Sequence, residues 1–414
     1  MSVQPHSLPV GWRWSKLGEF LCSIEAGKSP KAQERPANPE EWGVLKVSAV
    51  TWGEFRHQEN KALFPESDPN GIPTVSAGDL LISRANTVEL VGAVAMAKEN
   101  HPRLILSDKT LRLNPNLSLI NPIYLLYALR TPNARRHLES HATGTSGSMQ
   151  NISQANIRST PIALPPLEEQ HRIAAILDKA DAVRRKRKEA IALTEELLRS
   201  AFLEMFGELS AKDWQMTTIE HIAASHKGSL RTGPFGSQLL HSEFVDEGIA
   251  VLGIDNAVQN QFSWAKPRFI TEAKYKQLKR YTVRPEDVII TIMGTCGRCA
   301  IVPENCPTAI NTKHLCCITL DQTKCIPEFL HSYFLLHPQA RQYLEKNVKG
   351  AIMDGLNLTI IKDLPVPVAP IDLQKKYKTL SSKIQNLKKQ HTDSSNSQTE
   401  LFNSLLQRAF RGEL

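Results

Sequence analysis

Two long stretches of the chain carry apolar residues at helical spacing and contain neither proline nor glycine. The first stays compatible with a helix from Leu167 to Phe206, and Gly207 follows it. Such a helix would span about 60 Å, because each residue adds about 1.5 Å. Its apolar and small residues recur in steps of three and four, as in the seam of a coiled coil. These are Ile176, Ala180, Val183, Ala190, Leu197 and Ala201, with Arg187 and Thr194 at the same spacing. The pattern therefore predicts a helical partner.

The partner that we predict is a second stretch near the end of the chain, after Ala369-Pro370. The two starts correspond at an offset of 204 residues, from Gln170 to Gln374, and the two ends at an offset of 208, from Leu197 to Leu405. The second copy thus has four extra residues (208 − 204), which we place in the polar stretch 392–399. Four residues added to a heptad run rotate the seam little. Two unrelated surface helices are the alternative, but the matching starts and ends favour a duplication with antiparallel pairing. The seam of the second copy comprises Leu373, Tyr377, Leu380, Ile384, Leu387 and His391.

The segments that precede the two long helices also repeat. Leu8-Pro9-Val10-Gly11-Trp12 opens the first copy, and Asp213-Trp214 opens the second. Short leucine-rich or β-branched runs behind turn signals predict strands. They recur at 44–47 and 251–254, 78–83 and 286–291, 90–95 and 295–300, and 107–113 and 311–317. One short helix with proline in its first turn follows in each copy, at 121–128 and 326–333. A polar, glycine-bearing loop comes next, at 143–151 and 349–355.

These elements predict an α+β fold with an internal repeat. Two globular α/β domains would be joined by two long antiparallel coiled-coil helices and related by a pseudo-two-fold axis. The predicted boundaries are 1–163 for the first globular domain, 164–207 for the central helix, 208–368 for the second globular domain and 369–414 for the C-terminal helix. Two similar but unequal heads on paired helices suit the reading of two separated sites on one long ligand. Duplex DNA fits, because one face of it recurs about every 34–36 Å.

The charge balance points to the same class of ligand. Lysine and arginine number 50 against 42 for aspartate and glutamate, a net charge of +8, and the isoelectric point is near 9.0. Such an excess favours a polyanionic partner, and nucleic acid is the leading candidate. No run approaches the 18 or so apolar residues of a membrane span, and the N-terminus lacks the features of a signal peptide. We expect a soluble, cytoplasmic protein without a membrane partner.

Cysteines are unevenly distributed, because six of the seven lie between Cys296 and Cys325. An odd number in one cluster is not a secreted disulfide framework. The Cys296-Gly297-Arg298-Cys299 spacing invites a zinc interpretation. The repeat, however, aligns Cys299 with Val94 and Cys317 with Leu113, which are apolar positions in predicted strands. We therefore favour buried thiols that pack as small apolar groups over a metal site.

Several motifs together resemble one known family. They are the Gly11-Trp12 opening, the helix start Leu164-Pro165-Pro166-Leu167-Glu168-Glu169-Gln170, the segment 290–298, and the closing Gln407-Arg408-Ala409-Phe410-Arg411-Gly412-Glu413-Leu414. The chain resembles, over its whole length, the specificity subunit of type I restriction-modification systems. The second helix start, Val368-Ala369-Pro370-Ile371-Asp372-Leu373-Gln374, departs from the usual pattern of that family.

The resemblance implies a function and a set of partners. Each head would be a target recognition domain, and the two together would read a bipartite, asymmetric sequence in double-stranded DNA. The chain itself would be non-catalytic and without a cofactor or metal. Two DNA-adenine methyltransferase subunits would bind S-adenosylmethionine, and restriction/translocase subunits would bind ATP and Mg²⁺.

Two other classes of function stay open. One is the specificity component of a type II-like restriction system that cuts beside its site. The other is a two-headed coiled-coil scaffold that binds protein and not DNA. The positive charge and the two-headed layout disfavour the scaffold.

Candidate DNA-contacting residues are polar side chains on the expected loops of the heads. Arginine pairs with guanine, Asn or Gln with adenine, and Ser or Thr with phosphate. In the first head we predict Lys28, Lys31, Arg56, Arg84, Asn86, Thr145, Ser146 and Gln150. In the second we predict Arg231, Ser237, Asn256, Thr295, Arg298, Lys313 and Lys349.

Three further motifs are weaker. Asn121-Pro122-Ile123-Tyr124 is close to the Asn-Pro-Pro-Tyr tetrad of adenine methyltransferases, but the second copy replaces it and a capped helix start explains it. Gly27-Lys28-Ser29 lacks the earlier glycine of a phosphate-binding loop, so we interpret it as a basic loop. Arg184-Arg185-Lys186-Arg187-Lys188 points all round a helix. Solvated charge, phosphate contact and an acidic partner all remain open for this run.

Overall fold

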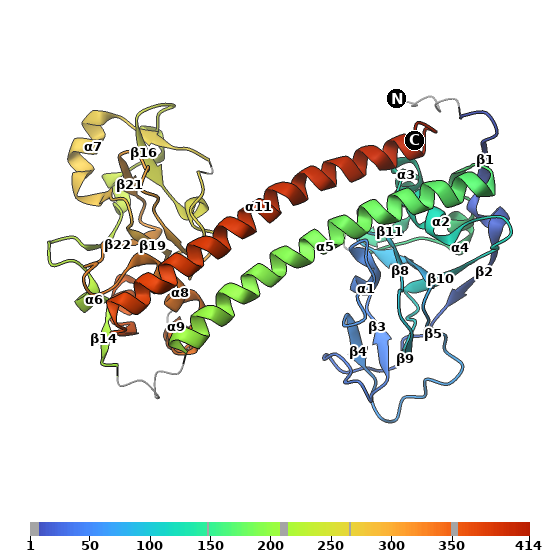
Figure 1. Cartoon of the computed structure of the whole chain (residues 1–414), viewed down its shortest axis with the longest axis horizontal. Coiled ribbons are helices and arrows are strands. Elements are labelled where there is room, and N and C mark those ends of the chain that lie inside the picture. Colours follow the sequence, from blue (N-terminus) through green and yellow to red (C-terminus); the bar gives the residue numbers. More distant parts are fainter. Residues whose placement is uncertain (1–7, 147–148, 208–213, 265, 349–354) are drawn as a thin grey trace. The chain divides into compact units, whose positions relative to one another are not determined.

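The chain divides into two compact units, each built from one head and part of both long helices. The computed structural model describes residues 8–146, 149–207, 214–264, 266–348 and 355–414. The first unit is Met1–Lys188 with Asp393–Leu414, and the second is Glu189–Thr392 (Figure 1). The boundaries predicted above set the helices apart from the heads, whereas each compact unit includes a head with its share of the helices.

The first head contains two four-stranded sheets and two smaller ones. One sheet has the order β2 (Leu21–Ala26), β10 (Thr110–Pro115), β6 (Leu80–Ser83), β8 (Val94–Met96); the other has the order β4 (Asn60–Ala62), β3 (Gly43–Leu45), β9 (His101–Ile105), β5 (Thr74–Val75). β1 (Arg13–Lys16) pairs with β13 (Pro161–Leu164), and β11 (Thr143–Ser146), β12 (Met149–Asn151) and β7 (Ala85–Asn86) form a small sheet. The helices are η1 (Leu17–Phe20), α1 (Ser48–Thr51), α2 (Pro122–Ala128), α3 (Pro132–Ser140) and α4 (Gln154–Arg158).

The second head repeats this topology. Its sheets have the orders β15 (Leu230–Thr232), β22 (Leu315–Ile318), β19 (Val288–Thr291), β20 (Cys299–Ile301) and β17 (Phe269–Ile270), β16 (Ile249–Leu252), β21 (Ala309–Asn311), β18 (Thr282–Val283), and β14 (Met216–Thr218) pairs with β23 (Pro365–Pro367). The helices are α6 (Ile219–Ile222), η3 (Gly236–Gln238), η4 (His241–Glu243), η5 (Ile254–Asn256), α7 (Glu272–Leu278), η6 (Lys279–Tyr281), α8 (Pro327–Leu336), α9 (Pro338–Val348) and α10 (Leu358–Lys362). Among the described strands, each copy has one parallel pair, β3 with β9 or β16 with β21, and it lies inside the second sheet. The predicted internal repeat is confirmed.

The central strand of each head lies between two cores. In β6, Leu80 and Ile82 pack in the core shared with α2 and α5, whereas Leu81 packs in a separate core beside β9. In β19, Val288 and Ile290 face one core and Ile289 faces the other. A strand covered on both faces has no polar side, which explains its uninterrupted apolar sequence.

Two local predictions are wrong. Each head has a second helix after the predicted one, α3 or α9, and a short third one, α4 or α10. The predicted loop 143–151 is a hairpin, β11 with β12, added to β7. Its residues do not alternate between apolar and polar types along the sequence, so this pairing left no strand pattern to predict it from. The equivalent loop 349–355 lies outside the described residues except for Gly355.

The long helices α5 (Leu167–Phe206) and α11 (Ile371–Ala409) pair antiparallel within each unit. In the first unit, the Arg184 guanidinium lies 5.3 Å from the ring centre of Phe402. In the second, Phe202 and Tyr377 make an edge contact with ring centres 5.3 Å apart, and Glu195 forms an ion pair with Lys388 at 2.6 Å. α11 remains helical through 392–399, where we placed the extra residues.

The predicted seam is only partly buried. Tyr377 and Ile384 are buried as expected, but Val183 and Leu197 are about half exposed. Packing against the heads also determines which face of a long helix is buried. On α5, Ile173 and Leu177 pack with Tyr124 and Tyr127 of α2 in one core. The heptad steps therefore predicted the pairing of the helices but not which side chains it covers.

One glutamine fastens the start of each long helix to its head. Gln170 accepts from the backbone N of Asn121 at 2.9 Å and donates to the carbonyls of Leu119 and Pro165. Gln374 accepts from the N of Ile326 at 3.0 Å and donates to the carbonyls of Lys324 and Ala369. Both side chains are buried, so the glutamine of each helix start is a structural anchor.

Among the described residues, no helix combines the length and the apolar composition needed to cross a membrane.

Candidate nucleic-acid interface

We call the sheets β2-β10-β6-β8 and β15-β22-β19-β20 the main sheets of the two heads. In the first head, the antiparallel order of the main sheet brings several predicted residues to one edge. β2 and β6 end where β10 begins, because β10 lies between them and runs the other way. Lys28 follows β2, Arg84 and Asn86 follow β6, and Lys109 precedes β10. The backbone N of Arg84 donates to the carbonyl of Lys109 at 2.8 Å, and that of Lys28 to the carbonyl of Leu106 at 3.1 Å. We call this group the first recognition edge.

Glycine is required where the strand segments meet at this edge. A Cβ atom on Gly27 would lie 1.8 Å from the carbonyl oxygen of Leu106. At the equivalent place in the second head, a Cβ atom on Gly233 would lie 2.1 Å from the carbonyl oxygen of Asn311. No side chain fits between two backbones so close together. The glycine of Gly27-Lys28-Ser29 is thus explained by packing.

The hairpin β11–β12 extends the first recognition edge. Gln150 of β12 pairs in register with Asn86 of β7, and Thr145 and Ser146 lie in β11. The Asn86 amide donates to Oγ1 of Thr51 at 3.1 Å, which joins the turn after α1 to the same edge. Four of the eight predicted residues of this head (Asn86, Thr145, Ser146 and Gln150) therefore belong to one small sheet.

The other two candidates of the first head, Arg56 and Lys31, lie outside the first recognition edge. Arg56 is partly buried and donates to Glu54 Oε1 from Nε at 3.0 Å and from Nη2 at 2.6 Å. Lys31 is exposed, on the segment between β2 and β3.

The second head has the corresponding edge. Thr295 and Arg298 follow β19, Lys313 precedes β22, and Ser237 lies in η3 after β15; all four are exposed. Buried Thr291 fixes the turn after β19, because its hydroxyl accepts from the N of Arg298 at 2.9 Å and donates to the carbonyl of Thr295. These four residues form the second recognition edge. Lys349 lies outside the described residues.

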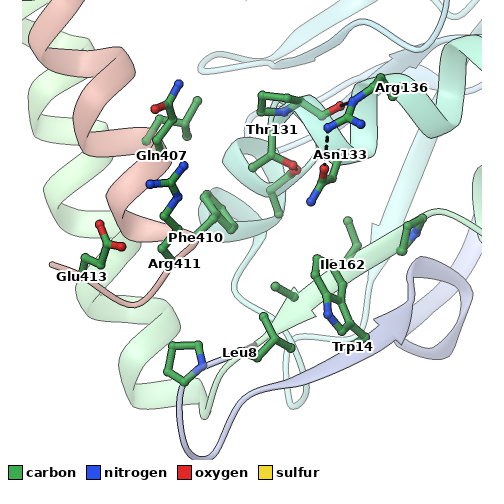
Figure 2. A pocket seen from close by; sticks show the side chains of 16 residues that line it. Leu8, Trp14, Thr131, Asn133, Arg136, Ile162, Gln407, Phe410, Arg411 and Glu413 are labelled. Carbon is green, nitrogen blue, oxygen red and sulfur yellow. Dashed lines mark hydrogen bonds between the residues drawn. The ribbon is translucent and has the colours of Figure 1, made fainter. Parts of the chain in front are cut away.

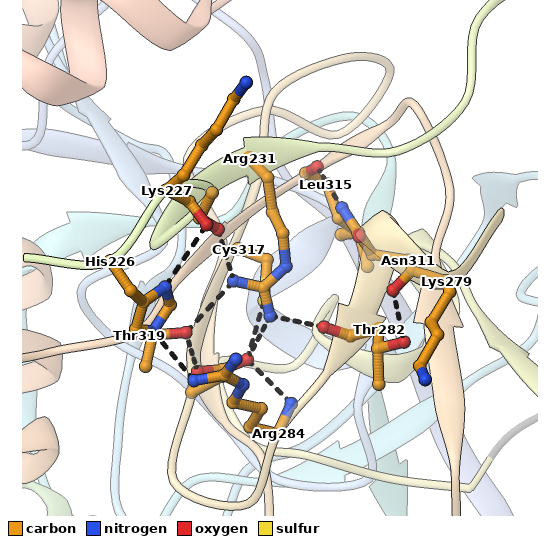
Figure 3. Close-up of polar contacts among 12 residues, drawn as sticks. His226, Lys227, Arg231, Lys279, Thr282, Arg284, Asn311, Leu315, Cys317 and Thr319 are labelled. Carbon is orange, nitrogen blue, oxygen red and sulfur yellow. Dashed lines mark hydrogen bonds and ion pairs between the residues drawn. The ribbon is translucent and has the colours of Figure 1, made fainter. Parts of the chain in front are cut away.

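Two candidates in the second head have structural partners instead. Arg231 is 8% exposed; its guanidinium pairs with Asp287 at 2.5 Å and donates to the carbonyl of Thr282 at 2.6 Å (Figure 3). Asn256 is 3% exposed; its side-chain oxygen accepts from the backbone N of Gly253, and its amide nitrogen donates to the carbonyl of Ser263. The side chains of Arg231 and Asn256 are buried and bonded inside the domain, so neither can reach a base, and we remove both residues from the candidate surface.

Lys109 was missed by sequence reasoning although its signal was present. The strand registers, Thr110 opposite Ser83 and Leu315 opposite Thr291, make Lys109 equivalent to His314, the residue after the predicted Lys313. Comparing the copies position by position would have pointed to this part of the first head.

The buried cysteines are part of the core. Cys299, Cys316, Cys317 and Cys325 are buried, as predicted for thiols that replace apolar side chains. Burial raises the pKa of Cys316 to about 12, so its thiol stays protonated at neutral pH. The described residues include no group of three side chains suited to hold a metal ion.

The other motifs also have structural explanations. Asn121 caps α2, accepting from the N of Ile123 at 2.9 Å and of Tyr124 at 3.0 Å, which confirms the capped helix start. In the cationic run of α5, Arg184 and Arg185 both pair with buried Asp181. Lys188, whose side chain is 70% exposed, is the more accessible charge.

A groove of about 830 Å³ lies elsewhere in the first unit, between the end of α11, α3 and the β1–β13 pair. Figure 2 shows Trp14, Asn133, Arg136, Phe410 and Arg411 around it. None of the predicted DNA-contacting residues lines this groove, so it is separate from the first recognition edge.

The chain is thus a duplicated protein whose two heads repeat one fold and carry polar residues at the same edge of the sheet. The chain belongs to the family described as the type I restriction modification DNA specificity domain, whose model matches residues 9–193 and again 212–394. The matched segments are the two copies of the internal repeat.

Individual relatives agree with this assignment. The specificity subunit of the type I restriction enzyme EcoEI from Escherichia coli is 36% identical over 176 residues, which cover 42% of this chain and 30% of the relative. The EcoBI specificity subunit from the same organism is 25% identical over 307 residues, 66% of this chain and 62% of the relative. The match thus spans less than two thirds of either relative. The MjaVIII specificity subunit from Methanocaldococcus jannaschii is 20% identical over 402 residues, 92% of this chain and 87% of the relative.

Solved structures share the fold. A crystal structure of a type I restriction-modification system S subunit from M. genitalium superposes with a TM-score of 0.61 at 16% identity, covering 99% of this chain and 98% of that one. A chain from a study of complex assembly in the type I R-M system gives a TM-score of 0.52 at 19% identity, covering 99% and 100%.

Proposed function

We propose that this chain is the DNA sequence-specificity subunit of a type I restriction-modification complex. It binds a bipartite, asymmetric target in duplex DNA, with one half-site per head. The observation that carries the proposal is that one scaffold presents different polar residues at the same edge: Arg84 and Asn86 after β6, but Thr295 and Arg298 after β19. A repeated frame with unequal contacts is what an asymmetric site requires.

The partners that we propose are two DNA-adenine methyltransferase subunits and the restriction/translocase subunits. S-adenosylmethionine, ATP and Mg²⁺ would bind to those subunits, and this chain would be non-catalytic and act in the cytoplasm beside the DNA. Large apolar side chains on the outer faces of the long helices support a protein partner there. They are Val183, Leu193 and Leu197 on α5, and Leu380, Leu387 and Leu401 on α11. The names of the relatives support a type I system over a type II-like one.

The experiment is to express the chain with the methyltransferase encoded beside it and to map adenine methylation by single-molecule sequencing. We expect one bipartite motif with a fixed gap. A folded, intact complex that leaves no methylation and retains no DNA on a filter would overturn the proposal and favour the protein-binding scaffold.

Single arginines then connect each head to one half-site. Arg84→Ala should relax the motif in one half and Arg298→Ala in the other, each costing about 1–3 kcal/mol of discrimination if the arginine reads guanine. Arg103→Ala is the matched control, because Arg103 is exposed, pairs with Glu40 and lies on β9, outside the recognition edge. Relaxation of the same half by both variants would contradict one half-site per head.

A further inference from the structure

In both heads a side chain from the α2 or α8 region joins the same two backbone carbonyls. In the first head, Nη2 of Arg130 donates to the carbonyl of Gly53 at 2.5 Å and to that of Val94 at 3.4 Å. In the second, Nε2 of His331 contacts the carbonyl of Asn260 at 2.9 Å and that of Cys299 at 3.1 Å. Both partners of His331 are acceptors, so Nε2 carries the proton.

The two bridges are equivalent although the bridging residues are not. Val94 and Cys299 correspond at an offset of 205 (299 − 94) and both begin the edge strand of the main sheet, β8 or β20. Gly53 and Asn260 both have left-handed backbones, with φ of +76° and +59°. Arg130 follows the end of α2, whereas His331 lies inside α8. The longer arginine side chain therefore reaches the two carbonyls from a position about one helical turn further along. Because two different residues make the same bridge, we infer that both heads require this link between the edge strand and the segment with the left-handed residue.

The anchored segments are turns that carry an exposed tryptophan. Trp52 precedes Gly53 and is 56% exposed; Trp264 is 48% exposed in the segment that follows Asn260. We call residues 51–56 and 257–264 the tryptophan turns.

Each tryptophan turn is also held by an asparagine. Asn86 of the first recognition edge donates to Thr51, next to Trp52. Asn256 donates to the carbonyl of Ser263, next to Trp264, at 2.8 Å. An exposed indole on a backbone fixed at two points is a preorganised contact, not a loose surface residue.

Cationic residues accompany both indoles, in space at Trp52 and along the chain at Trp264. The Arg56 guanidinium lies 5.9 Å from the ring centre of Trp52, and exposed Lys188 is close to the same turn, 3.9 Å from Glu54. Exposed Lys266 and partly exposed Arg268 follow Trp264. An indole flanked by cations suits DNA, because its face packs on sugars and thymine methyl groups and its N–H donates to phosphate.

From these contacts we propose that Trp52 and Trp264 contact DNA, one in each half-site, and that Arg130 and His331 are positioning residues that hold the two tryptophan turns. This inference rests on the proposed function. It adds two tryptophans to the candidate DNA-contacting residues, which were chosen from polar side chains alone. Arg130 and His331 act through the turns and do not touch the DNA.

The first test measures equilibrium binding of the complex with its methyltransferase to a duplex that carries the mapped target. Trp52→Ala and Trp264→Ala should each weaken binding by about tenfold, as expected for a contact residue of this type. Trp42→Ala is the matched control, because Trp42 is 37% exposed in the first head but lies outside the tryptophan turn. Equal affinities for the Trp52, Trp264 and Trp42 variants would overturn the contact.

The second test separates positioning from general stability. Arg130→Met and His331→Phe remove the donors but keep much of the volume, and each should reduce discrimination against base changes in its own half-site only. Arg130→Lys and His331→Gln keep a donor and should retain most of the discrimination. Unchanged discrimination in the Met and Phe variants would overturn the positioning role.

Gly53→Ala covers the case in which a donor-deleted variant does not fold. A Cβ at Gly53 meets no atom within 4 Å, so alanine strains only the left-handed backbone of the turn. It should reproduce the loss of discrimination in the first half-site, and normal discrimination would count against the positioning role. A complex that recognises no motif at all would instead refute the proposed function, so the two failures are distinguishable.

Discussion

An arginine–aspartate ion pair recurs in both heads, buried in the second and half-buried in the first, with its arginine on different strands. In the second head, Arg231 of β15 pairs with Asp287 and donates to the carbonyl of Thr282. In the first, Arg112 lies 3.5 Å from Asp79 and donates to the carbonyl of Thr74 at 2.7 Å, but it stands on β10. The strand register pairs Arg112 with Glu25 and Arg231 with Cys317, so the guanidinium has moved across one strand pair. The position of the charge is retained, and the residue that supplies it is not.

His331 should make the second unit sensitive to acid. Burial lowers the pKa of His331 below its ordinary value of 6.5. Below about pH 6.5 the unfolded chain then binds a proton that the folded chain does not, so stability falls as the pH falls. His331→Gln removes this effect, and the free energy of unfolding of wild type relative to the variant should drop by up to about 1.4 kcal/mol per pH unit.

Denaturant unfolding between pH 7.5 and 5 would measure the difference. The control is His241→Gln, on the surface of the same unit, which should follow wild type. A constant gap between wild type and His331→Gln across this range would show that His331 titrates alike in both states.

Among the secondary-structure elements, the sequence predicted those that have a regular hydrophobic pattern or that occur in both copies of the repeat. The long helices lack proline and glycine for about ten turns, so α5 and α11 were identified with almost the correct limits. The main strands are buried on both faces and appear as apolar runs. The hairpin β11–β12 and the exposed faces of the long helices depend on backbone pairing and on the heads, and neither leaves a periodic signal.

The candidate site was predictable to a similar extent. Residues of the recognition edges such as Arg84 and Arg298 follow predicted strands, so their place in the fold could be deduced. Arg231 could not be separated from them, because only its strand neighbours show that it is paired inside the domain. Trp52 and Trp264 gave no signal, since their roles depend on carbonyl contacts with residues far along the chain.

The glutamine anchors should contribute similar stability to both units. Gln170→Ala and Gln374→Ala each leave a backbone N–H and two carbonyls without their partner, so each should lower the free energy of unfolding by about 1–3 kcal/mol. Gln385→Ala is the matched control, because Gln385 is exposed on α11. Denaturant unfolding followed by circular dichroism measures all three, and a loss no greater than in the control would mean that the anchors are dispensable.

For the whole molecule, the important feature is that both long helices belong to both units. α5 passes from the first unit to the second after Lys188, and α11 returns after Thr392. The only described segments that cross between the units are these two helices, and each is unbroken at the crossing. We therefore expect helix length to set the gap between the half-sites.

Lengthening both helices by whole heptads at these crossing points tests that expectation. Three heptads, about 21 residues, add about 31 Å, close to one duplex turn of about 34–36 Å, and keep the seam in phase. The variant should prefer a gap about nine or ten base pairs longer, with both half-site sequences unchanged. One heptad adds only about 10 Å, near three base pairs, which turns the second half-site away by roughly a third of a turn and should weaken binding. Selection from duplexes with gaps of every length measures the preference, and an unchanged optimal gap in the three-heptad variant would show that the helices do not set the spacing.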